Sequence, residues 1–364
     1  MAGPFDSLCE KIHEYCGSPA LAGRGVQIME VCGTHTVAIA QSGLRGLLPE
    51  ALRLISGPGC PVCVTDRSYV DQALWLASGE DSTAELPIIA TYGDMVRVPG
   101  SRGSLAQARA GGAQVAVVSS ADQAVTLAKA NPDRQVVFLA VGFETTAPGT
   151  ALAVLRARDE GVSNFSALTA HKLILPAMRA LLSGGEAKID GFLCPGHVSV
   201  ILGWAAYDEI VRDFGRPCVV AGFDPGNIVK GVEAILAQLV AGRPAACSVY
   251  PAVAHDGNAR ALKLLDEVFE PADATWRALG VIPSSGLALR EEFAEFDAAR
   301  RFNPPAEDSS DDPRCLCGEV ITGRARPRQC ALFGRECTPR EPVGPCMVSS
   351  EGACATAYKY ERDE

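Results

Sequence analysis

The 364-residue sequence lacks the marks of several common protein classes. Its first residues, MAGPFDSLCEKIHEYCG, contain neither a basic nor an apolar segment, which argues against a secretory signal peptide. No run approaches the roughly 18 consecutive apolar residues that a membrane helix needs. A net charge of −10 argues against nucleic-acid binding, which depends on clustered Lys and Arg. We therefore expect a cytoplasmic protein with reduced thiols and with no membrane or nucleic-acid partner.

Nucleotide-binding signatures are missing as well. Neither G-x-G-x-x-G nor G-x-x-x-x-G-K-[ST] occurs in the chain, which counts against a nucleotide-dependent enzyme. A cysteine-rich pattern in a reducing compartment indicates metal binding or redox chemistry more often than a framework of structural disulfides.

Cysteine itself is abundant at the carboxyl end. Six of the fourteen cysteines follow residue 314, and this tail contains no histidine. A structural zinc site usually pairs its sulfur ligands in short C-x₂₋₄-C knuckles, and the spacing here provides none. Iron–sulfur clusters accept four cysteines at varied spacings, so the spacing leaves a cluster, zinc and disulfides open. The six residues are Cys315, Cys317, Cys330, Cys337, Cys346 and Cys354.

Short apolar runs alternate with helical stretches, a pattern that predicts parallel sheets covered by helices. We expect an α/β fold with two similar doubly wound, Rossmann-like domains and a mainly irregular, helical carboxyl-terminal domain that a metal or the other domains must hold. The predicted boundaries are 1–130, 131–245 and 246–364, with an acidic linker at 303–314. The expected strands are 26–31, 52–56, 88–92 and 114–119 in the first domain and 136–141, 167–170, 191–194 and 218–221 in the second.

Two loops after the first strands carry cysteine. The first strand leads into Cys32-Gly33-Thr34-His35-Thr36, where an imidazolium or a helix N-terminus would lower the pKa of the Cys32 thiol. A thiolate there would serve as a nucleophile or a soft-metal ligand, whereas a buried cysteine beside a capping threonine is the structural alternative. The second strand leads into GPGCPVC at 57–63, a C-x-x-C between strand and helix that suits a redox dithiol. Half of a zinc knuckle is the alternative for Cys60 and Cys63.

Three further loops are polar for their position at strand ends. The loop 92–100 offers Asp94 and Arg97, GFETTAP at 142–148 offers Glu144, and PGHVS at 195–199 offers His197. A single Glu or His at such a position is more often a cap or a satisfied polar group. Because the carboxyl ends of parallel strands form the binding crevice of α/β sheets, we predict one shared site between the two domains.

Five motifs in order now make the chain resemble a known family. MEVCGTHT (29–36), GPGCPVC (57–63), GFETTAP (142–148), PGHVSVILG (195–203) and the tail sequence CGEVITG…CALFGRECTP…GPCMVSSEGACATAYKY look like the hydrogenase maturation factor HypD family. The resemblance extends from residue 29 almost to the end. It implies a scaffold that works with a small HypC-type chaperone while iron acquires cyanide and carbon monoxide ligands for a [NiFe]-hydrogenase. It also implies a HypE-type cyanide donor that acts with HypF, and a [4Fe–4S] cluster.

The resemblance assigns roles to individual residues. Cys32 is the expected ligand of the iron under assembly, supported by Thr34 and His35, and Cys60 and Cys63 match the redox-active pair. Glu144 and His197 match polar motif residues of the same crevice. For the cluster the resemblance favours four of the tail cysteines, with the choice among six left open. The four are Cys317, Cys330, Cys337 and Cys354.

These expectations favour an assembly scaffold with a dithiol–cluster relay over a conventional turnover enzyme. One alternative is a freestanding iron–sulfur-dependent thiol–disulfide oxidoreductase, which would not need Cys32. The other is a zinc-stapled interaction module.

Overall fold

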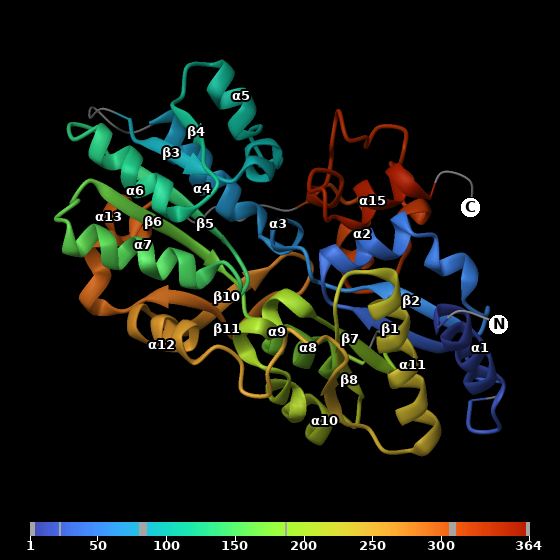
Figure 1. The fold of residues 1–364 in the computed structure, drawn as a ribbon. Coiled ribbons are helices and arrows are strands. Elements are labelled where there is room, and N and C mark those ends of the chain that lie inside the picture. Colours follow the sequence, from blue (N-terminus) through green and yellow to red (C-terminus); the bar gives the residue numbers. More distant parts are fainter. Residues whose placement is uncertain (1–3, 22, 80–85, 186–187, 306–310, 362–364) are drawn as a thin grey trace.

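The computed structural model describes residues 4–21, 23–79, 86–185, 188–305 and 311–361. Two parallel β-sheets with helices on their faces form most of this part of the chain, and the cysteine-rich tail lies against the first sheet (Figure 1). The expected α/β fold with parallel sheets and a helical, irregular carboxyl-terminal region is confirmed. None of the described helices is both long and apolar enough to cross a membrane.

The first sheet has the strand order β2-β1-β7-β8-β9, and all neighbours are parallel. Its inner strands β1, β7 and β8 are short runs that are almost wholly buried, as inner parallel strands usually are, whereas the edge strands β2 and β9 are partly exposed. Helices α1 (Pro4–Gly17) and α11 (Pro225–Ala241) cover one face. The strands are β1 (Val26–Glu30), β2 (Leu52–Ser56), β7 (Gly191–Pro195), β8 (Cys218–Ala221) and β9 (Ala246–Ser248).

The second sheet has the order β4-β3-β5-β6 and is also parallel. Every residue of the inner strand β5 (Val136–Gly142) is buried. Alternate side chains of β5 enter two different apolar clusters, one under α6 and α7 and the other under α4. The remaining elements of this region are β3 (Ile88–Thr91), β4 (Val115–Val117), β6 (Phe165–His171), α4 (Arg67–Ser78), α5 (Leu105–Ala110), α6 (Ala121–Ala130), α7 (Ala147–Asp159) and α8 (Ile174–Ser183).

The strands are shared between the sheets differently from the prediction. β3 and β4, expected in the first domain, pair with β5 and β6, while β7 and β8, expected in the second, complete the first sheet. The boundaries predicted at 130 and 245 therefore do not separate the sheets, and the chain crosses between them after β2 and again after β6. An apolar run specifies burial but not its neighbour, so local pattern could not assign these partners.

An antiparallel hairpin, β10 (Phe269–Trp276) and β11 (Gly280–Leu289), was not expected from the sequence. It lies against both crossings, because Trp276 bridges Thr65 after β2 and Gly286 bridges Lys172 after β6. Nearby are α9 (Gly196–Leu202), α10 (Asp208–Phe214), α12 (Ala259–Val268) and α13 (Ala298–Phe302), with the 3-10 helices η3 (Trp204–Tyr207) and η4 (Glu291–Phe296).

The tail consists of short elements that pack on α2 (Gly33–Gln41) and α3 (Pro61–Val64), and is drawn in red in Figure 1. Residues 306–310 of the predicted linker lie outside the described residues. The tail elements are α14 (Cys317–Ile321), α15 (Ala353–Tyr360), η5 (Pro327–Gln329) and η6 (Pro345–Met347); the other short turns are η1 (Leu44–Leu47) and η2 (Gly93–Arg97).

Candidate functional site

The two cysteine-bearing loops lie side by side at the carboxyl ends of β1 and β2. Cys32 precedes α2, and the Gly33 N–H donates to the Gly59 carbonyl at 3.2 Å. A Cβ on Gly59 would lie 2.2 Å from the Cys32 backbone nitrogen, which no side chain tolerates. Glycine at this position therefore allows the C-x-x-C loop to lie directly against Cys32.

Cys60 and Cys63 form a disulfide with their Cα atoms 5.3 Å apart. Cys60 is the N-cap of α3, its sulfur accepts the Cys63 N–H at 3.2 Å, and Pro61 occupies the first turn. The helix start is thus where the sequence placed it, because proline there has no N–H to lose. Both cysteines are buried.

The Cys32 thiol is also buried, and this burial raises its pKa to about 11. Within this net shift, the Glu351 carboxylate adds to the effect of burial, and hydrogen bonds from His35 and Thr34 oppose it. The expectation of a lowered thiol pKa is wrong for the free protein, because desolvation outweighs the helix N-terminus. Cys32 holds its proton near neutral pH.

His35 is a neutral imidazole rather than the expected imidazolium. Its Nε2–H donates to the carbonyls of Ala221 at 3.2 Å and Gly222 at 3.0 Å, and since carbonyls only accept, the proton is on Nε2. Burial lowers the pKa of the ring to about 4. Nδ1 is buried and has no hydrogen-bond partner. His35 therefore fixes α2 against the loop after β8.

His197 approaches this region from the surface. Its exposed ring packs on Phe223 with the centroids 4.1 Å apart, and Phe223 in turn lies 5.0 Å from the ring of His35. His197 is thus connected to the Cys32 loop through two intervening rings.

Glu144 occupies a different position. It is buried just past β5, and its Oε1 accepts the Ile174 N–H at 2.9 Å. Oε2 is buried without a hydrogen-bond partner, and burial raises the pKa of the carboxyl to about 7. Its hydrogen bond holds the start of α8 and does not join it to Cys32 or His197.

The tail is attached to the Cys32 loop by its segment 349–351. Thr34 donates from Oγ1 to Glu351 Oε1 at 2.8 Å, and a Cβ on Gly33 would lie 2.6 Å from the Glu351 Cβ. Asp94 Oδ2 accepts from Ser349 Oγ at 3.0 Å. Asp94 and Arg97 do not act as the expected pair, because Arg97 bonds to the carbonyl of Pro339. Both residues hold the tail instead.

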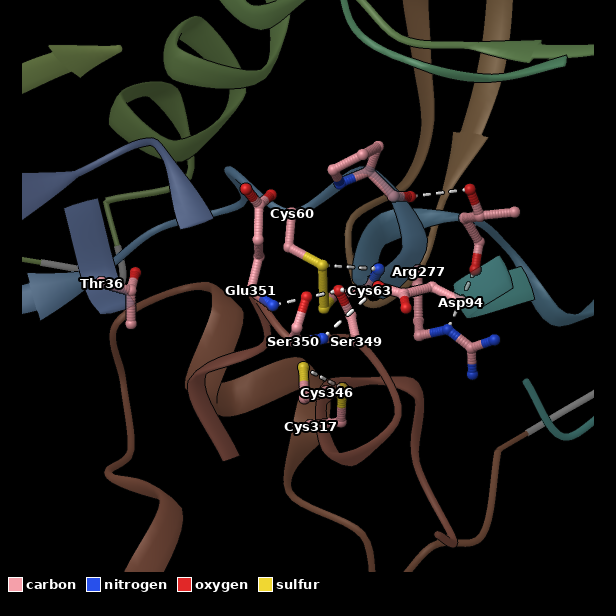
Figure 2. Close-up of a disulfide and its surroundings, with 12 residues drawn as sticks. Thr36, Cys60, Cys63, Asp94, Arg277, Cys317, Cys346, Ser349, Ser350 and Glu351 are labelled. Carbon is pink, nitrogen blue, oxygen red and sulfur yellow. Dashed lines mark hydrogen bonds between the residues drawn. A yellow bond between two sulfur atoms is a disulfide. The ribbon is translucent and has the colours of Figure 1, made fainter. Parts of the chain in front are cut away.

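The six tail sulfurs are near one another. Cys317 Sγ lies 2.7 Å from Cys346 Sγ, and both face the Cys60–Cys63 disulfide in Figure 2. Burial raises the pKa of the Cys315 thiol to about 12, with added effects of Cys317, Cys330 and Cys354. Cys330 and Cys354 likewise add to the raised pKa of Cys337, after burial. In the described part of the chain no three or more Cys, His, Asp or Glu side chains are already arranged to hold a metal ion.

A set of donors made of thiols alone suits thiophilic iron or zinc, so the chemistry of these residues fits an iron–sulfur cluster. The cluster itself stays a prediction, as does the selection of its four ligands.

Arg277 is a part of the site that the sequence did not indicate. Its N–H donates to the Val64 carbonyl at 2.9 Å and its Nε to the Thr65 carbonyl at 3.0 Å, so it holds the end of α3 (Figure 2). Nη1 pairs with Asp311, and Nη2 is buried without a partner. The guanidinium lowers the pKa of Cys317, although the hydrogen bond from Cys346 is the larger cause. A single arginine in the turn between β10 and β11 gives no recognisable sequence signal.

Fold and site together define a class of protein: an α/β protein in which a disulfide at a sheet edge lies between a buried thiol and a cysteine-rich tail. The family model HypD, described as "Hydrogenase formation hypA family", matches residues 5–361. The chain is 46% identical over 345 residues to the hydrogenase maturation factor HypD of Escherichia coli, covering 94% of this chain and 91% of the relative.

Two other relatives of the same name give a similar result. The protein of Cupriavidus necator is 42% identical over 364 residues, covering 98% of this chain and 95% of its own. That of Azotobacter vinelandii is 45% identical over 347 residues, with 93% and 90% covered. The chain therefore belongs to the HypD family of hydrogenase maturation factors.

Proposed function

We propose that this maturation factor holds iron on Cys32 while the iron receives cyanide and carbon monoxide, and that its other cysteines supply electrons. The carrying observation is that the Cys60–Cys63 disulfide lies against the Cys32 loop on one side and faces the tail sulfurs on the other. A HypC-type chaperone contributes a second cysteine to the iron, and a HypE-type protein, acting with HypF, delivers cyanide. The cytosolic location expected from the sequence belongs to this proposal.

Cys32 takes up iron by exchanging its proton for the metal. The thiol is protonated in the free protein, and a coordinating thiol is deprotonated outright. Hydrogen bonds from Thr34 and His35 to the Cys32 sulfur then favour the charged thiolate. Sulfur is a soft ligand and is compatible with iron that carries cyanide and carbon monoxide. Burial of Cys32 keeps water away from the bound iron.

The C-x-x-C pair stores two electrons. Reduction of Cys60–Cys63 breaks the S–S bond, consumes two electrons and two protons, and leaves two thiols. A [4Fe–4S] cluster bound to the tail would pass these electrons one at a time from a one-electron donor protein. The exposed His197 is available to a partner, and the buried Glu144, whose pKa lies near neutral, holds the start of α8.

The sulfur positions favour one set of cluster ligands. Cubane ligands bind four separate irons at alternate corners, so two sulfurs in contact at 2.7 Å are poorly placed to serve together. We therefore assign Cys317 and Cys346 to a second dithiol, which leaves Cys315, Cys330, Cys337 and Cys354 for the cluster. The sequence resemblance favoured Cys317 in place of Cys315. Cys315→Ser should remove the visible absorbance of the anaerobically purified protein, and Cys317→Ser should retain it; the reverse result would restore the first selection.

The iron assignment is tested with Cys32→Ala, prepared anaerobically as the complex with its chaperone. Infrared bands of iron-bound cyanide and carbon monoxide should disappear, while the absorbance of the tail cluster remains. Cys9→Ala is the matched control, because Cys9 lies on α1 away from the site. Persistence of the bands in Cys32→Ala would refute the role of this cysteine.

The formed disulfide also supports a second candidate, a freestanding thiol–disulfide oxidoreductase. This function requires Cys60 and Cys63 but not Cys32. Hydrogenase maturation in cells that carry Cys32→Ala separates the two, since an oxidoreductase would keep its activity in that variant.

A further inference from the structure

A long groove runs along the outer edge of the first sheet, on the side of the tail. Its volume is about 1350 Å³. One wall is formed by all five residues of β2 (Leu52–Ser56), and the other by tail residues that include Gly323, Ala325 and Ala353.

β2 is the outermost strand of its sheet and pairs only with β1 among the described residues. Successive strand side chains point to opposite faces, so five consecutive lining residues mean that the groove follows the strand edge rather than one face. The Val26 N–H bonds to Ala51 O and the Gly57 N–H to Glu30 O. These two bonds show that β2 bonds to β1 through its odd-numbered residues. The N–H and C=O of Leu54 therefore point away from β1. The edge therefore offers backbone donors and acceptors to the groove.

The groove has the opposite charge from the chain as a whole. Five basic and two acidic side chains line it, whereas the chain carries a net charge of −10. Arg45 is engaged by Glu361 and Glu30, and Arg324 by Glu319. Arg53, in the middle of β2, is exposed, and Arg326 is exposed on the opposite wall. The excess of positive charge thus lies on both sides of the strand edge.

We propose that this groove binds an extended, acidic segment of a partner protein, which adds to β2 as a further strand. Backbone bonds to the free edge would provide affinity, and acidic side chains facing Arg53 and Arg326 would provide selectivity. A second copy of this chain is a poor occupant, because edge-to-edge pairing would bring two basic grooves together.

The groove also extends to α2, the helix that follows Cys32 in the candidate site. Thr36 lines it, and the same hydroxyl donates to the Cys32 carbonyl at 3.4 Å. A segment seated in the groove would therefore contact the helix that begins at Cys32. The inference goes beyond the proposed iron and redox chemistry, since it depends on the strand edge and on charge and not on any sulfur.

The test uses the full-length chain and a fluorescein-labelled peptide of alternating Glu and Val, followed by fluorescence anisotropy. We expect saturable binding that weakens at least tenfold in Arg53→Glu/Arg326→Glu and is unchanged in Arg109→Glu, an exposed arginine on α5. The same peptide N-methylated at alternate residues should not bind, because it cannot form the backbone ladder. That probe is used on the unaltered protein and so does not depend on how the variants fold.

Several results would overturn the proposal. Equal binding of the N-methylated peptide would mean general electrostatic adhesion, and binding insensitive to the double substitution would place the peptide elsewhere. Absence of peptide binding would also contradict an acidic partner segment. So would a dimer, seen in sedimentation, that dissociates in the double variant. Retained iron and thiol chemistry in Arg53→Glu/Arg326→Glu keeps this test separate from that of the proposed function.

Discussion

The two sheets and the cysteine-rich tail differ in how much apolar surface they bury. In the sheets, whole strands are buried and large side chains such as Phe138, Phe165 and Phe192 are inaccessible to solvent. In the described part of the tail the longest helix, α15, has eight residues. Apolar tail side chains such as Leu332 and Met347 enter the same buried cluster as α3 and α4. Polar contacts of Glu351 and Asp94 add to this attachment.

The effect of a single substitution therefore depends on the region in which it lies. Stability in the sheets is spread over many apolar contacts, so a core substitution affects the whole unfolding transition. The tail buries fewer apolar side chains and also relies on polar contacts and on its sulfurs, so a substitution there should release it while the sheets remain folded.

The largest expected effect is on the tail. Cys337→Ser removes one of the proposed cluster ligands in both selections considered, and a short segment that has lost its metal group keeps only a small number of apolar contacts. Limited proteolysis should cut the variant after residue 314 and leave a resistant fragment containing both sheets. Cys9→Ala should be cut no faster than the unaltered chain. A tail that stays resistant in Cys337→Ser would show that packing alone holds it.

A core substitution should have the opposite pattern. Phe138→Ala empties a fully buried site in β5 and should cost roughly 3–5 kcal/mol of unfolding free energy, measured by urea denaturation. Sheet and tail signals should shift together, and the tail absorbance should be unchanged under native conditions. A shift confined to one probe would contradict the cooperative core.

Glu144 sharpens the contrast because it is a polar group inside the apolar region. Burial raises its pKa from 4.5 to about 7, so the folded state binds the proton more tightly than the unfolded chain. The resulting stability is fully present below about pH 4.5 and is lost as the pH rises through 7, with a range on the order of 3 kcal/mol. Glu144→Gln should remove this dependence, as seen in urea unfolding at about pH 5 and about pH 8. An unchanged pH profile would place the titration elsewhere.

The smallest effect concerns one bond between the two regions. Thr34→Val keeps the shape of the side chain but removes the hydrogen bond to Glu351, and should weaken tail attachment by about 1 kcal/mol. Hydrogen exchange should rise in residues 349–351 and stay constant in β5. Faster exchange in β5 would mean that the tail and the sheets are not separate units.

Sequence reasoning located most elements but not their pairing. The strands expected at 52–56 and 136–141 lie within a residue of β2 and β5, because both are short runs rich in apolar residues. Membership of a sheet was wrong for β3 and β7, since their apolar runs suit either sheet. The hairpin β10–β11 was missed because Pro271, Gly280 and several polar residues interrupt its pattern.

In the candidate site, too, some features could be predicted from the sequence and others could not. The nearness of Cys32 and Cys60 could be expected from parallel strands whose carboxyl ends share an edge. The pKa of Cys32 could not, because it depends on burial, which the motif does not reveal. Arg277 could not be expected either, since its partners at Val64 and Thr65 are remote in sequence.

The double crossing of the chain has a consequence for synthesis on the ribosome. β1 ends at Glu30 and its neighbour β7 begins at Gly191, so about 160 residues must be translated before the first sheet can close. At roughly 5–20 residues per second, Cys32 and Cys60 wait on the order of 10–30 seconds without their final surroundings. The second sheet, continuous in sequence, is complete before β7 emerges. These thiols are therefore most accessible to oxidants during synthesis, before the fold encloses them.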